Sequence, residues 1–305
     1  MSMTATITAD MVKTLREKTG AGMMDVRNAL SEASGDMDKA TEILRQKGIA
    51  SADNKSGRAT SEGLIQAEIS ADAKSGALIE VNCETDFVAR NENFVEMVTK
   101  LGQHVLASAL DTLDAIVGAP MTGSTMNVGD YIKENISVIK ENLSFQRMGK
   151  LSITGPGLVH SYIHTGGKIG VLLALTTDSD AAANNDGFKQ LAKDLTMHIA
   201  SCAPEFVQIE DIPQAVRDDE KRIEMGKEDL QSKPVEIREK IVTGRVEKLL
   251  AQRVLCQQPY VKDPSKTVQQ HVEETAKTLG AGNITIQAFL RFALGETAEP
   301  STGEE

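Results

Sequence analysis

Residues 63–83 have the sequence GLIQAEISADAKSGALIEVNC, and residues 157–177 have the sequence GLVHSYIHTGGKIGVLLALTT. The second segment repeats the first at an offset of 94 residues (157 − 63), with glycines and apolar residues at matching positions. The match continues without a gap, so that Phe94 corresponds to Phe188 and His104 corresponds to His198. Chance rarely supplies so long an ungapped correspondence, and we therefore interpret the middle of the chain as a duplication.

Each copy of the repeat predicts a β-hairpin followed by a helix. Two short apolar runs are joined by a turn that contains glycine, which is typical of a hairpin, and a longer amphipathic stretch follows. The expected strands and helix are 64–70, 77–83 and 93–107 in the first copy, and 158–164, 171–176 and 188–201 in the second. Residues common to both copies are expected to serve packing. We therefore interpret His104 and His198 as helix residues with satisfied hydrogen bonds rather than as ligands.

The two copies differ most after the second strand. Residues 85–91 are TDFVARN, whereas residues 179–185 are SDAAANN, so that Phe87 and Val88 correspond to alanines. Aromatic residues make up only 3% of the chain, which makes a phenylalanine in a polar loop conspicuous. Two interpretations remain open: Phe87 covers the local core as a lid, or it inserts into a partner protein as an apolar wedge. Burial of a phenylalanine is worth about 1.5–3 kcal/mol, enough to shift a partner's equilibrium about tenfold or more.

The first fifty residues predict a bundle of three short helices. Thr8 is expected to cap the first helix. Gly35 and Asp36 are expected to end the second helix and cap the third, and Gly48 is expected to end the third. Helices this short have only a small core to share.

The segment TGAGM at residues 19–23 separates the first two helices. A glycine-rich loop before a helix can bind an anion, but this one has no preceding strand and no lysine, which favours a tight turn between helices. Met23 and Met24 are adjacent and cannot both face the core. Methionine suits a deformable contact with a partner; the alternative is that one is buried and the other has no role.

The rest of the chain predicts further helices and two more strands. A helix around Ile132 is followed by a strand at 144–153 that is expected to enter the second copy. Beyond the repeat, apolar residues seven apart on either side of Lys233-Pro234 predict an antiparallel helical hairpin; they are Val216, Ile223, Leu230, Val235, Val242 and Leu249. A helix at 266–279 and a strand at 284–292 complete the fold, which we assign to the α+β class.

Composition and motifs exclude several classes of protein. With 33 basic and 44 acidic residues the net charge is −11, which opposes direct binding of nucleic acid. The sequence has no run of about 18 apolar residues and no apolar secretory signal, so we expect no membrane association and a cytoplasmic protein. The three cysteines and five histidines show no metal-ligand spacing. No nucleotide-binding or nucleophile motif occurs, and we expect no cofactor, no metal and no active site.

Four segments, in order along the chain, resemble the elongation factor Ts family. They are LREKTGAGMMD at 15–25, ETDFVARN at 84–91, HTGGKIGVL at 164–172 and PYVKDPSKTV at 259–268. The resemblance implies a guanine-nucleotide exchange factor that binds elongation factor Tu with GDP, dislocates its Mg²⁺ and promotes GDP release, so that GTP can bind during translation elongation. Nucleotide and Mg²⁺ would belong to the partner, and the protein would make or break no bond as an enzyme does. A homodimer or a 2:2 complex with the partner remains open.

The resemblance also implies a domain layout that agrees with the division drawn from the residues. The expected parts are a ubiquitin-associated-like three-helix domain at 1–54, one core subdomain at 55–152, the first part of a second core subdomain at 153–213, the helical hairpin at 214–256, a C-terminal module that completes the core at 257–295, and a frayed tail at 296–305.

By the same resemblance, individual residues receive roles. The residues expected to dislocate the partner's Mg²⁺ are Thr85, Asp86, Phe87 and Val88. The residues expected to bind the partner are Arg16, Met23, Met24, His164 and Val261. Lys262 departs from the family pattern, which often has an apolar residue there, and this departure bears on the C-terminal contact.

Three other interpretations remain. The N-terminal bundle could act as a peptide-binding adaptor, in which case Phe87 would have no role in nucleotide exchange. Asp86 or Glu84 could form an acid–base pair with a histidine in an enzyme. The helical hairpin could serve only to dimerise the protein.

Overall fold

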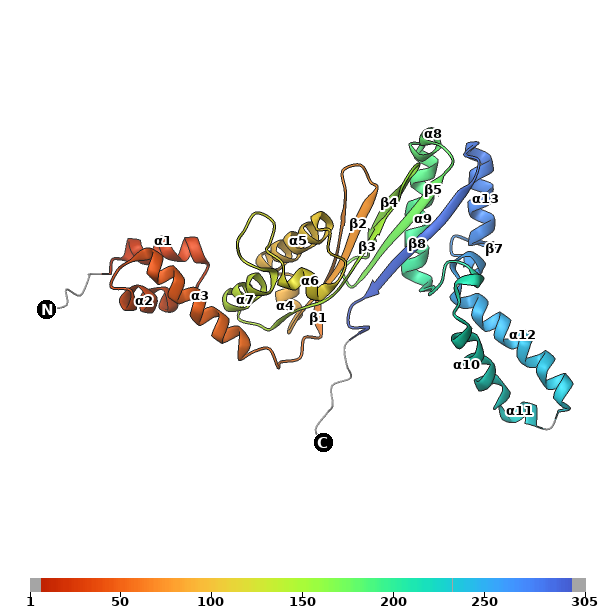
Figure 1. Cartoon of the computed structure of the whole chain (residues 1–305), viewed down its shortest axis with the longest axis horizontal. Coiled ribbons are helices and arrows are strands. Elements are labelled where there is room, and N and C mark those ends of the chain that lie inside the picture. Colours follow the sequence, from red (N-terminus) through yellow and green to blue (C-terminus); the bar gives the residue numbers. More distant parts are fainter. Residues whose placement is uncertain (1–6, 232, 298–305) are drawn as a thin grey trace.

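Two three-stranded antiparallel sheets form the centre of the molecule, and helices extend from it at both ends (Figure 1). The structure is a computed structural model that describes residues 7–231 and 233–297. The first sheet has the order β1 (Glu62–Ile69), β2 (Ser75–Cys83), β3 (Leu143–Ser152), and the second has the order β4 (Gly157–Ile163), β5 (Ile169–Thr177), β8 (Ile284–Ala293). The predicted α+β class is confirmed.

Each copy of the repeat contains a third strand that its hairpin pattern did not reveal. The strand predicted at 144–153 does not enter the second copy; β3 instead pairs antiparallel with β2. β8 pairs with β5 in the same way. The first pairing has a bulge between Glu80 and Val81, and the second has one at the equivalent place, between Ala174 and Leu175. A hairpin leaves backbone groups unpaired along both edges, and a third strand satisfies one edge in each copy.

The two sheets pack face to face through a reciprocal contact at matching glycines. A Cβ atom on Gly76 would lie 3.2 Å from the Leu172 side chain, and one on Gly170 would lie 2.9 Å from the Leu78 side chain. Gly76 corresponds to Gly170 and Leu78 to Leu172 in the repeat. Each sheet therefore receives a leucine of the other where it has no side chain of its own.

Backbone hydrogen bonds between the copies follow the same reciprocal pattern. The N–H of Ile65 donates to the carbonyl oxygen of Gly167 (2.8 Å), and the N–H of Val159 donates to that of Ala73 (2.7 Å). The repeat relates these two bonds to each other, so the copies face one another as in a twofold, isologous interface. Buried apolar residues fill the space between the sheets: Ile65, Leu78, Ile153, Val159, Leu172, Ala174 and Phe292.

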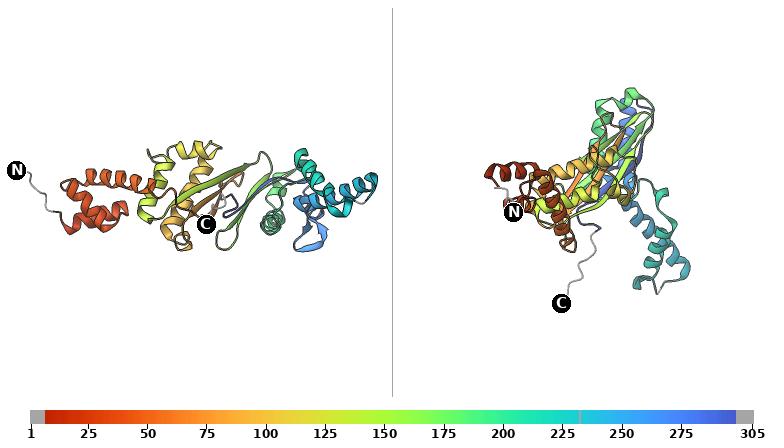
Figure 2. Two further views of the ribbon diagram at one scale, coloured as in Figure 1. Left: turned by 90° about the horizontal axis from the view of Figure 1, so that it is seen from below. Right: turned by 60° about the vertical axis from the view of Figure 1, so that its left-hand side comes forward.

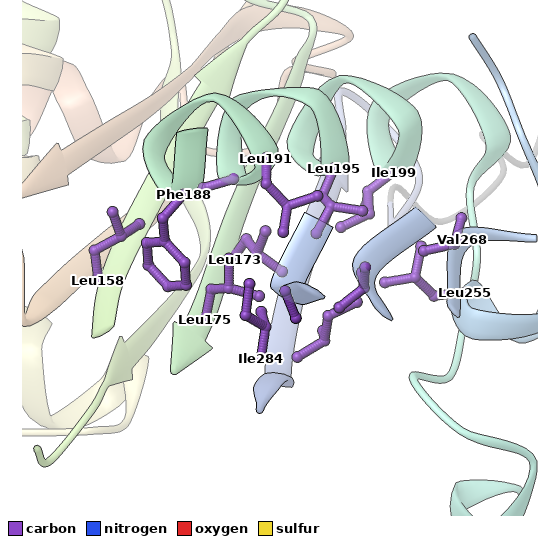
Figure 3. Close-up of a cluster of buried hydrophobic side chains, with 14 of the residues drawn as sticks. Leu158, Leu173, Leu175, Phe188, Leu191, Leu195, Ile199, Leu255, Val268 and Ile284 are labelled. Atoms are coloured by element: carbon purple, nitrogen blue, oxygen red, sulfur yellow. The ribbon is translucent and has the colours of Figure 1, made fainter. Parts of the chain in front are cut away.

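The outer face of each sheet is covered by the helix that the repeat predicted. α5 (Glu92–Ala107) buries Phe94 in the core of the first copy, and α9 (Asp186–Cys202) buries Phe188 in the core of the second. Figure 3 shows Phe188 beside Leu173 of β5 within that second core. Because alternate residues of β5 face α9 and the other sheet, the strand is buried on both sides.

The N-terminal bundle consists of α1 (Ala9–Thr19), α2 (Met23–Glu32) and α3 (Met37–Asp53), and the predicted three helices are confirmed. The hydroxyl of Thr8 accepts from the N–H of Met11 (3.2 Å), which caps α1 as expected. Asp36 caps α3. The buried core of the bundle is small: Leu15, Val26, Ala29, Leu30, Ala33 and Ala40.

Gly48 does not end the third helix, and that prediction was wrong. α3 continues to Asp53 and packs against α7 (Val128–Ile139). A Cβ atom on Gly48 would lie 2.9 Å from the Cβ of Ser137 in α7. The glycine allows two helices to approach closely, a role that the sequence alone does not distinguish from a helix end.

The helical hairpin extends away from the sheets (Figure 2). It is formed by α10 (Gln214–Met225), α11 (Glu228–Gln231) and α12 (Val235–Arg253). Of the predicted apolar stripe, Leu230 and Val242 are buried, but Ile223 and Val235 are more than half exposed. The seven-residue spacing was therefore wrong at these two positions. α12 instead buries residues spaced by four, namely Val242, Val246 and Leu250.

The remaining elements are short, except for one C-terminal helix. They are α4 (Asp86–Ala89), α6 (Leu113–Gly118), α8 (Asp180–Ala183), α13 (Val268–Leu279), β6 (Pro259–Tyr260), β7 (Asp263–Thr267) and the 3₁₀ helices η1 (Ile209–Asp211) and η2 (Leu255–Gln257). Of the tail predicted to fray, residues 298–305 lie outside the described part, whereas Glu296 pairs with Arg291 (2.9 Å) and Arg147 (3.4 Å). Within the described ranges, no helix has the length and apolar character needed to cross a membrane.

The reciprocal contact predicts opposite effects for one substitution at two glycines. Gly170→Ala places a Cβ atom 2.4 Å from Ile65, so the sheets must separate, at a cost of about 1–3 kcal/mol in free energy of unfolding. Gly244→Ala, within α12 where a Cβ meets nothing within 4 Å, should stabilise by about 0.5–1 kcal/mol. Urea denaturation followed by circular dichroism measures both. Equal midpoints for the two variants would contradict the close approach.

Candidate functional site

The segment that differs between the copies forms a short capped turn directly after β2. The hydroxyl of Thr85 accepts from the N–H of Val88 (3.3 Å) and so caps α4. In the second copy, the hydroxyl of Ser179 accepts from the N–H of Ala182 (3.2 Å) and caps α8 in the same way. The turn is therefore part of the repeated scaffold, and its side chains distinguish the two copies.

Phe87 points into solvent from this turn. Its side chain is 82% exposed, whereas Val88 is half-buried against the core and Ala89 is buried. The interpretation of Phe87 as a lid over the local core is therefore wrong. In the second copy the exposed position is occupied by Ala181, so that a large apolar side chain is presented on one copy only. Exposure of a phenylalanine side chain to water is unfavourable. A large apolar side chain that is exposed in this way is typical of a site that a partner covers.

A carboxylate from another part of the chain holds the start of this turn. One oxygen of Glu141, Oε2, accepts from the N–H of Glu84 (3.1 Å) and of Thr85 (3.0 Å). The other, Oε1, accepts from the hydroxyl of Thr85 (2.6 Å). Glu141 lies between α7 and β3 and is not among the site residues that the sequence predicts.

The acidic and thiol groups near Phe87 are arranged for structure rather than catalysis. Asp86 pairs with Arg90 (2.9 Å), and Glu84 accepts from the N–H of Asn142 (2.6 Å). Burial, reinforced by the charge of Glu141, raises the pKa of the Cys83 thiol to about 12, so it is not a nucleophile at neutral pH. In the described part of the chain, neither acid is hydrogen-bonded to a histidine, and no group of three or more potential metal ligands occurs.

Arg16, Met23 and Met24 come together at one groove of the N-terminal bundle. The groove has a volume of about 900 Å³ and lies between α1 and the start of α2; it is lined by Ile7, Thr8, Ala9, Val12, Lys13, Arg16, Glu17, Gly20, Met23, Met24 and Arg27. Met23 and Met24 are 59% and 63% exposed, so the interpretation that one of them is buried was wrong. A groove with methionines at its wall and arginines beside them suits an apolar surface with an acidic border.

His164 lies in the turn between β4 and β5, on the second copy. Its Nδ1 is hydrogen-bonded to the hydroxyl of Tyr162 (2.8 Å), and both side chains line a pocket of about 220 Å³ against α9. Met197 and Ser201 of α9 line the same pocket. The imidazole is thus exposed yet oriented, as a contact residue needs to be.

Val261 lies between β6 and β7 and is 44% exposed. Its N–H donates to Nδ1 of His198 (3.2 Å), so the proton of the ring is on Nε2 and donates to the side chain of Gln258 (2.9 Å). His198 is fully buried and both ring nitrogens are hydrogen-bonded, as the repeat predicted. The same prediction was wrong in part for His104, whose buried Nε2 has no hydrogen-bond partner within the described residues. The unexpected Lys262 is held by Asp194 of α9 (2.7 Å).

The predicted site residues therefore fall into three groups. The groove residues of the bundle form one, and the turn at 85–88 forms the second. His164 and Val261 form the third, because His164 lines a pocket with residues of α9 and Val261 is hydrogen-bonded to His198 of that helix. The sequence predicted neither Glu141, which holds the turn, nor the groove residues other than Arg16, Met23 and Met24. A comparison of the residues before the two third strands could have found Glu141, had those strands been recognised as equivalent.

Exposed apolar side chains on separate domains, each fixed by its own scaffold, are typical of an extended α+β protein that acts by contacting another protein. A family model described as Elongation factor TS matches residues 84–296. Elongation factor Ts of a Nitratiruptor species is 43% identical over 293 residues, which cover 96% of this chain and 94% of that protein.

Two further relatives agree with this match. Elongation factor Ts of a Nostoc species is 43% identical over 298 residues, 97% of this chain and 94% of that protein. Elongation factor Ts of Trichlorobacter lovleyi is 42% identical over 294 residues, 96% of this chain and 94% of that protein. The chain belongs to the elongation factor Ts family. Membership implies a nucleotide exchange factor for elongation factor Tu in translation elongation.

The burial of His198 predicts a pH dependence of stability. Burial lowers the pKa of His198 below its ordinary value of 6.5, so the unfolded chain binds a proton more readily than the folded one. The contribution of His198 to the free energy of unfolding should be fully present above pH 6.5 and decrease as the pH falls below it. The total decrease is about 1.4 kcal/mol for each tenfold difference in proton affinity between the unfolded and the folded chain. Urea midpoints measured between pH 7.5 and 5.5 show this decrease.

The variant His198→Asn tests the assignment, because the amide oxygen of asparagine can accept the N–H of Val261 without titrating. The decrease with falling pH should become shallower in the variant. His104, His160 and His271 also have their pKa lowered by burial and account for the part that remains. An identical slope in both proteins would show that unfolding does not change the proton affinity of His198.

Proposed function

We propose that the turn at residues 85–88 promotes GDP release by inserting Phe87 into elongation factor Tu and dislocating the Mg²⁺ that the partner holds. The observation that carries this proposal is the 82% exposure of Phe87 on a turn whose other apolar residues are packed. Its counterpart in the second copy is an alanine, so the aromatic side chain is not needed for the fold of the turn. The protein supplies no bond-making chemistry; nucleotide and Mg²⁺ belong to the partner.

The groove at Met23 and Met24 supports the second part of the proposal, in which the N-terminal bundle binds the same partner. Methionine side chains adapt to an irregular apolar surface, and Arg16 beside them can pair with a carboxylate at its border. His164 and Val261 provide the contacts of the second copy. This function is exerted in the cytoplasm, where translation elongation takes place.

Exchange of this kind requires reciprocal coupling. The protein accelerates GDP release only if it binds the nucleotide-free partner more tightly than the GDP-bound partner. By the same ratio, GDP or GTP weakens the complex, which is how the exchange factor leaves. The wedge therefore needs to act on the nucleotide site, while the groove contributes affinity to both states of the partner.

Truncation of Phe87 tests the wedge. Phe87→Ala should lower the maximal rate of fluorescent GDP release from elongation factor Tu about ten- to hundredfold, because burial of the ring is worth about 1.5–3 kcal/mol. Stopped-flow fluorescence at saturating protein measures this rate. The urea midpoint should be unchanged, since the ring makes little contact with the folded chain.

The repeat offers a matched control for position. Phe87→Ala combined with Ala181→Phe restores the composition and presents the aromatic ring on the equivalent exposed position of the second copy. This double variant should exchange as slowly as Phe87→Ala. Full activity of Phe87→Ala would keep the exchange function but refute the role of Phe87 in it. No acceleration by the intact, folded protein would refute exchange altogether and favour an adaptor.

Substitution in the groove should have a different kinetic signature. Met24→Ala removes an exposed contact of the bundle without touching the turn. We expect the protein concentration at half-maximal exchange to rise about tenfold and the maximal rate to stay within about twofold, because the contact is made in both partner states. A variant that lowers the maximal rate and leaves the half-maximal concentration unchanged would place Met24 in the exchange step instead.

A further inference from the structure

One hydrogen bond beside the turn that carries Phe87 is equivalent in the two copies and shows which residues correspond before their third strands. In the first copy, Glu84 accepts from the N–H of Asn142 (2.6 Å), just before β3. In the second copy, Asp178 accepts from the N–H of Asn283 (2.7 Å), just before β8. Because these bonds are equivalent, Asn142 corresponds to Asn283, and the register of the third strands confirms this by pairing Leu143 with Cys83 and Ile284 with Thr177.

This correspondence pairs Glu141 with Gly282. Glycine has no side chain, so the second copy has no carboxylate where the first copy has that of Glu141. The space is also absent, because a Cβ atom on Gly282 would lie 2.2 Å from the carboxylate of Asp178. The repeat thus shows that the cap and the turn form without this carboxylate, which is additional to the scaffold.

The contacts of Glu141 lead directly to Phe87. Its two oxygens accept from three donors: the N–H of Glu84, the N–H of Thr85 and the hydroxyl of Thr85. That hydroxyl, with its proton directed to Glu141, uses a lone pair to accept the N–H of Val88. Hydrogen bonds to a carboxylate are stronger than those between neutral groups, so the orientation of the hydroxyl, and with it the turn on which Phe87 stands, is fixed.

The residues on either side of Glu141 fix its own position. Lys140 has a left-handed backbone (φ 72°) at the end of α7, and its Nζ pairs with Asp25 of α2 (3.3 Å). The side chain of Asn142 donates to the carbonyl oxygens of Arg58 (2.8 Å) and Ser56 (3.3 Å). Three consecutive residues therefore contact three parts of the protein: Lys140 the N-terminal bundle, Glu141 the turn, and Asn142 the segment between α3 and β1.

We propose that Glu141 is a positioning residue for nucleotide exchange, which holds the turn at residues 85–88 in the orientation that lets Phe87 enter the partner. This inference rests on the function proposed above. Order in the free turn reduces the entropy lost on insertion, so the carboxylate acts on the exchange step and not on the grip of the bundle. It occurs in the copy that carries the phenylalanine and is missing from the copy that carries alanine.

A double-mutant cycle tests the inference. Glu141→Ala should lower the maximal rate of fluorescent GDP release from elongation factor Tu about tenfold, with the half-maximal protein concentration nearly unchanged. In the Phe87→Ala background the same substitution should have no further effect, because a residue that acts through Phe87 has nothing left to position. Glu141→Gln, which keeps one acceptor oxygen, should be intermediate. Ser179→Ala, which removes the equivalent cap in the second copy, should leave the maximal rate unchanged.

The outcomes separate this inference from the function on which it depends. If the intact protein accelerates release and Phe87→Ala slows it, but Glu141→Ala is as fast as the intact protein, the proposed function stands and the role of Glu141 is refuted. If Glu141→Ala slows release equally in both backgrounds, the residue acts on general structure and the inference is also refuted. A folded Glu141→Ala protein, with unaltered circular dichroism, is the condition for each comparison; Glu141→Gln serves in its place if it is not met.

Discussion

The contact between the two sheets at Gly76 and Gly170 constrains the whole core. Each glycine leaves a gap that a leucine of the opposite sheet fills, and the backbone bonds beside it are exchanged in the same reciprocal way. Because the inner faces are committed to each other, the outer faces need covers of their own, which α5 and α9 supply. The four layers, helix, sheet, sheet and helix, follow from this single packing geometry.

The proposed contacts all lie on segments that the four layers leave free. The turn with Phe87 follows β2, His164 lies where β4 turns into β5, and Val261 is attached to the end of α9. The groove with Met24 belongs to a separate bundle, which α3 joins to the first copy by packing on α7. Rigid strands and helices thus support short exposed segments, an arrangement in which a loop can change its residues without cost to the core.

Much of this was predictable because the sequence contains its own comparison. Matching glycines and apolar residues located the hairpins and helices, and the contrast between Phe87 and Ala181 identified the exposed position. The third strands were not found as equivalents, since inserted helices of different length precede them, and Glu141 was missed for the same reason. Gly48 could be read as a helix end or a close approach, and only the position of α7 decides between them. A seven-residue spacing also fitted Ile223 and Val235, although neither is buried. The spacing of apolar residues alone does not show which face of a short helix packs against its neighbour in the hairpin.

An interface in which each surface meets its own counterpart is the geometry of a symmetric dimer. Here both halves belong to one polypeptide, so their association is intramolecular and does not weaken on dilution. Two identical subunits would also have to change together, since one gene would encode both. A fused pair is free of that restriction: one half can gain an aromatic side chain and the carboxylate beneath it, while the other keeps alanine and glycine at the same places.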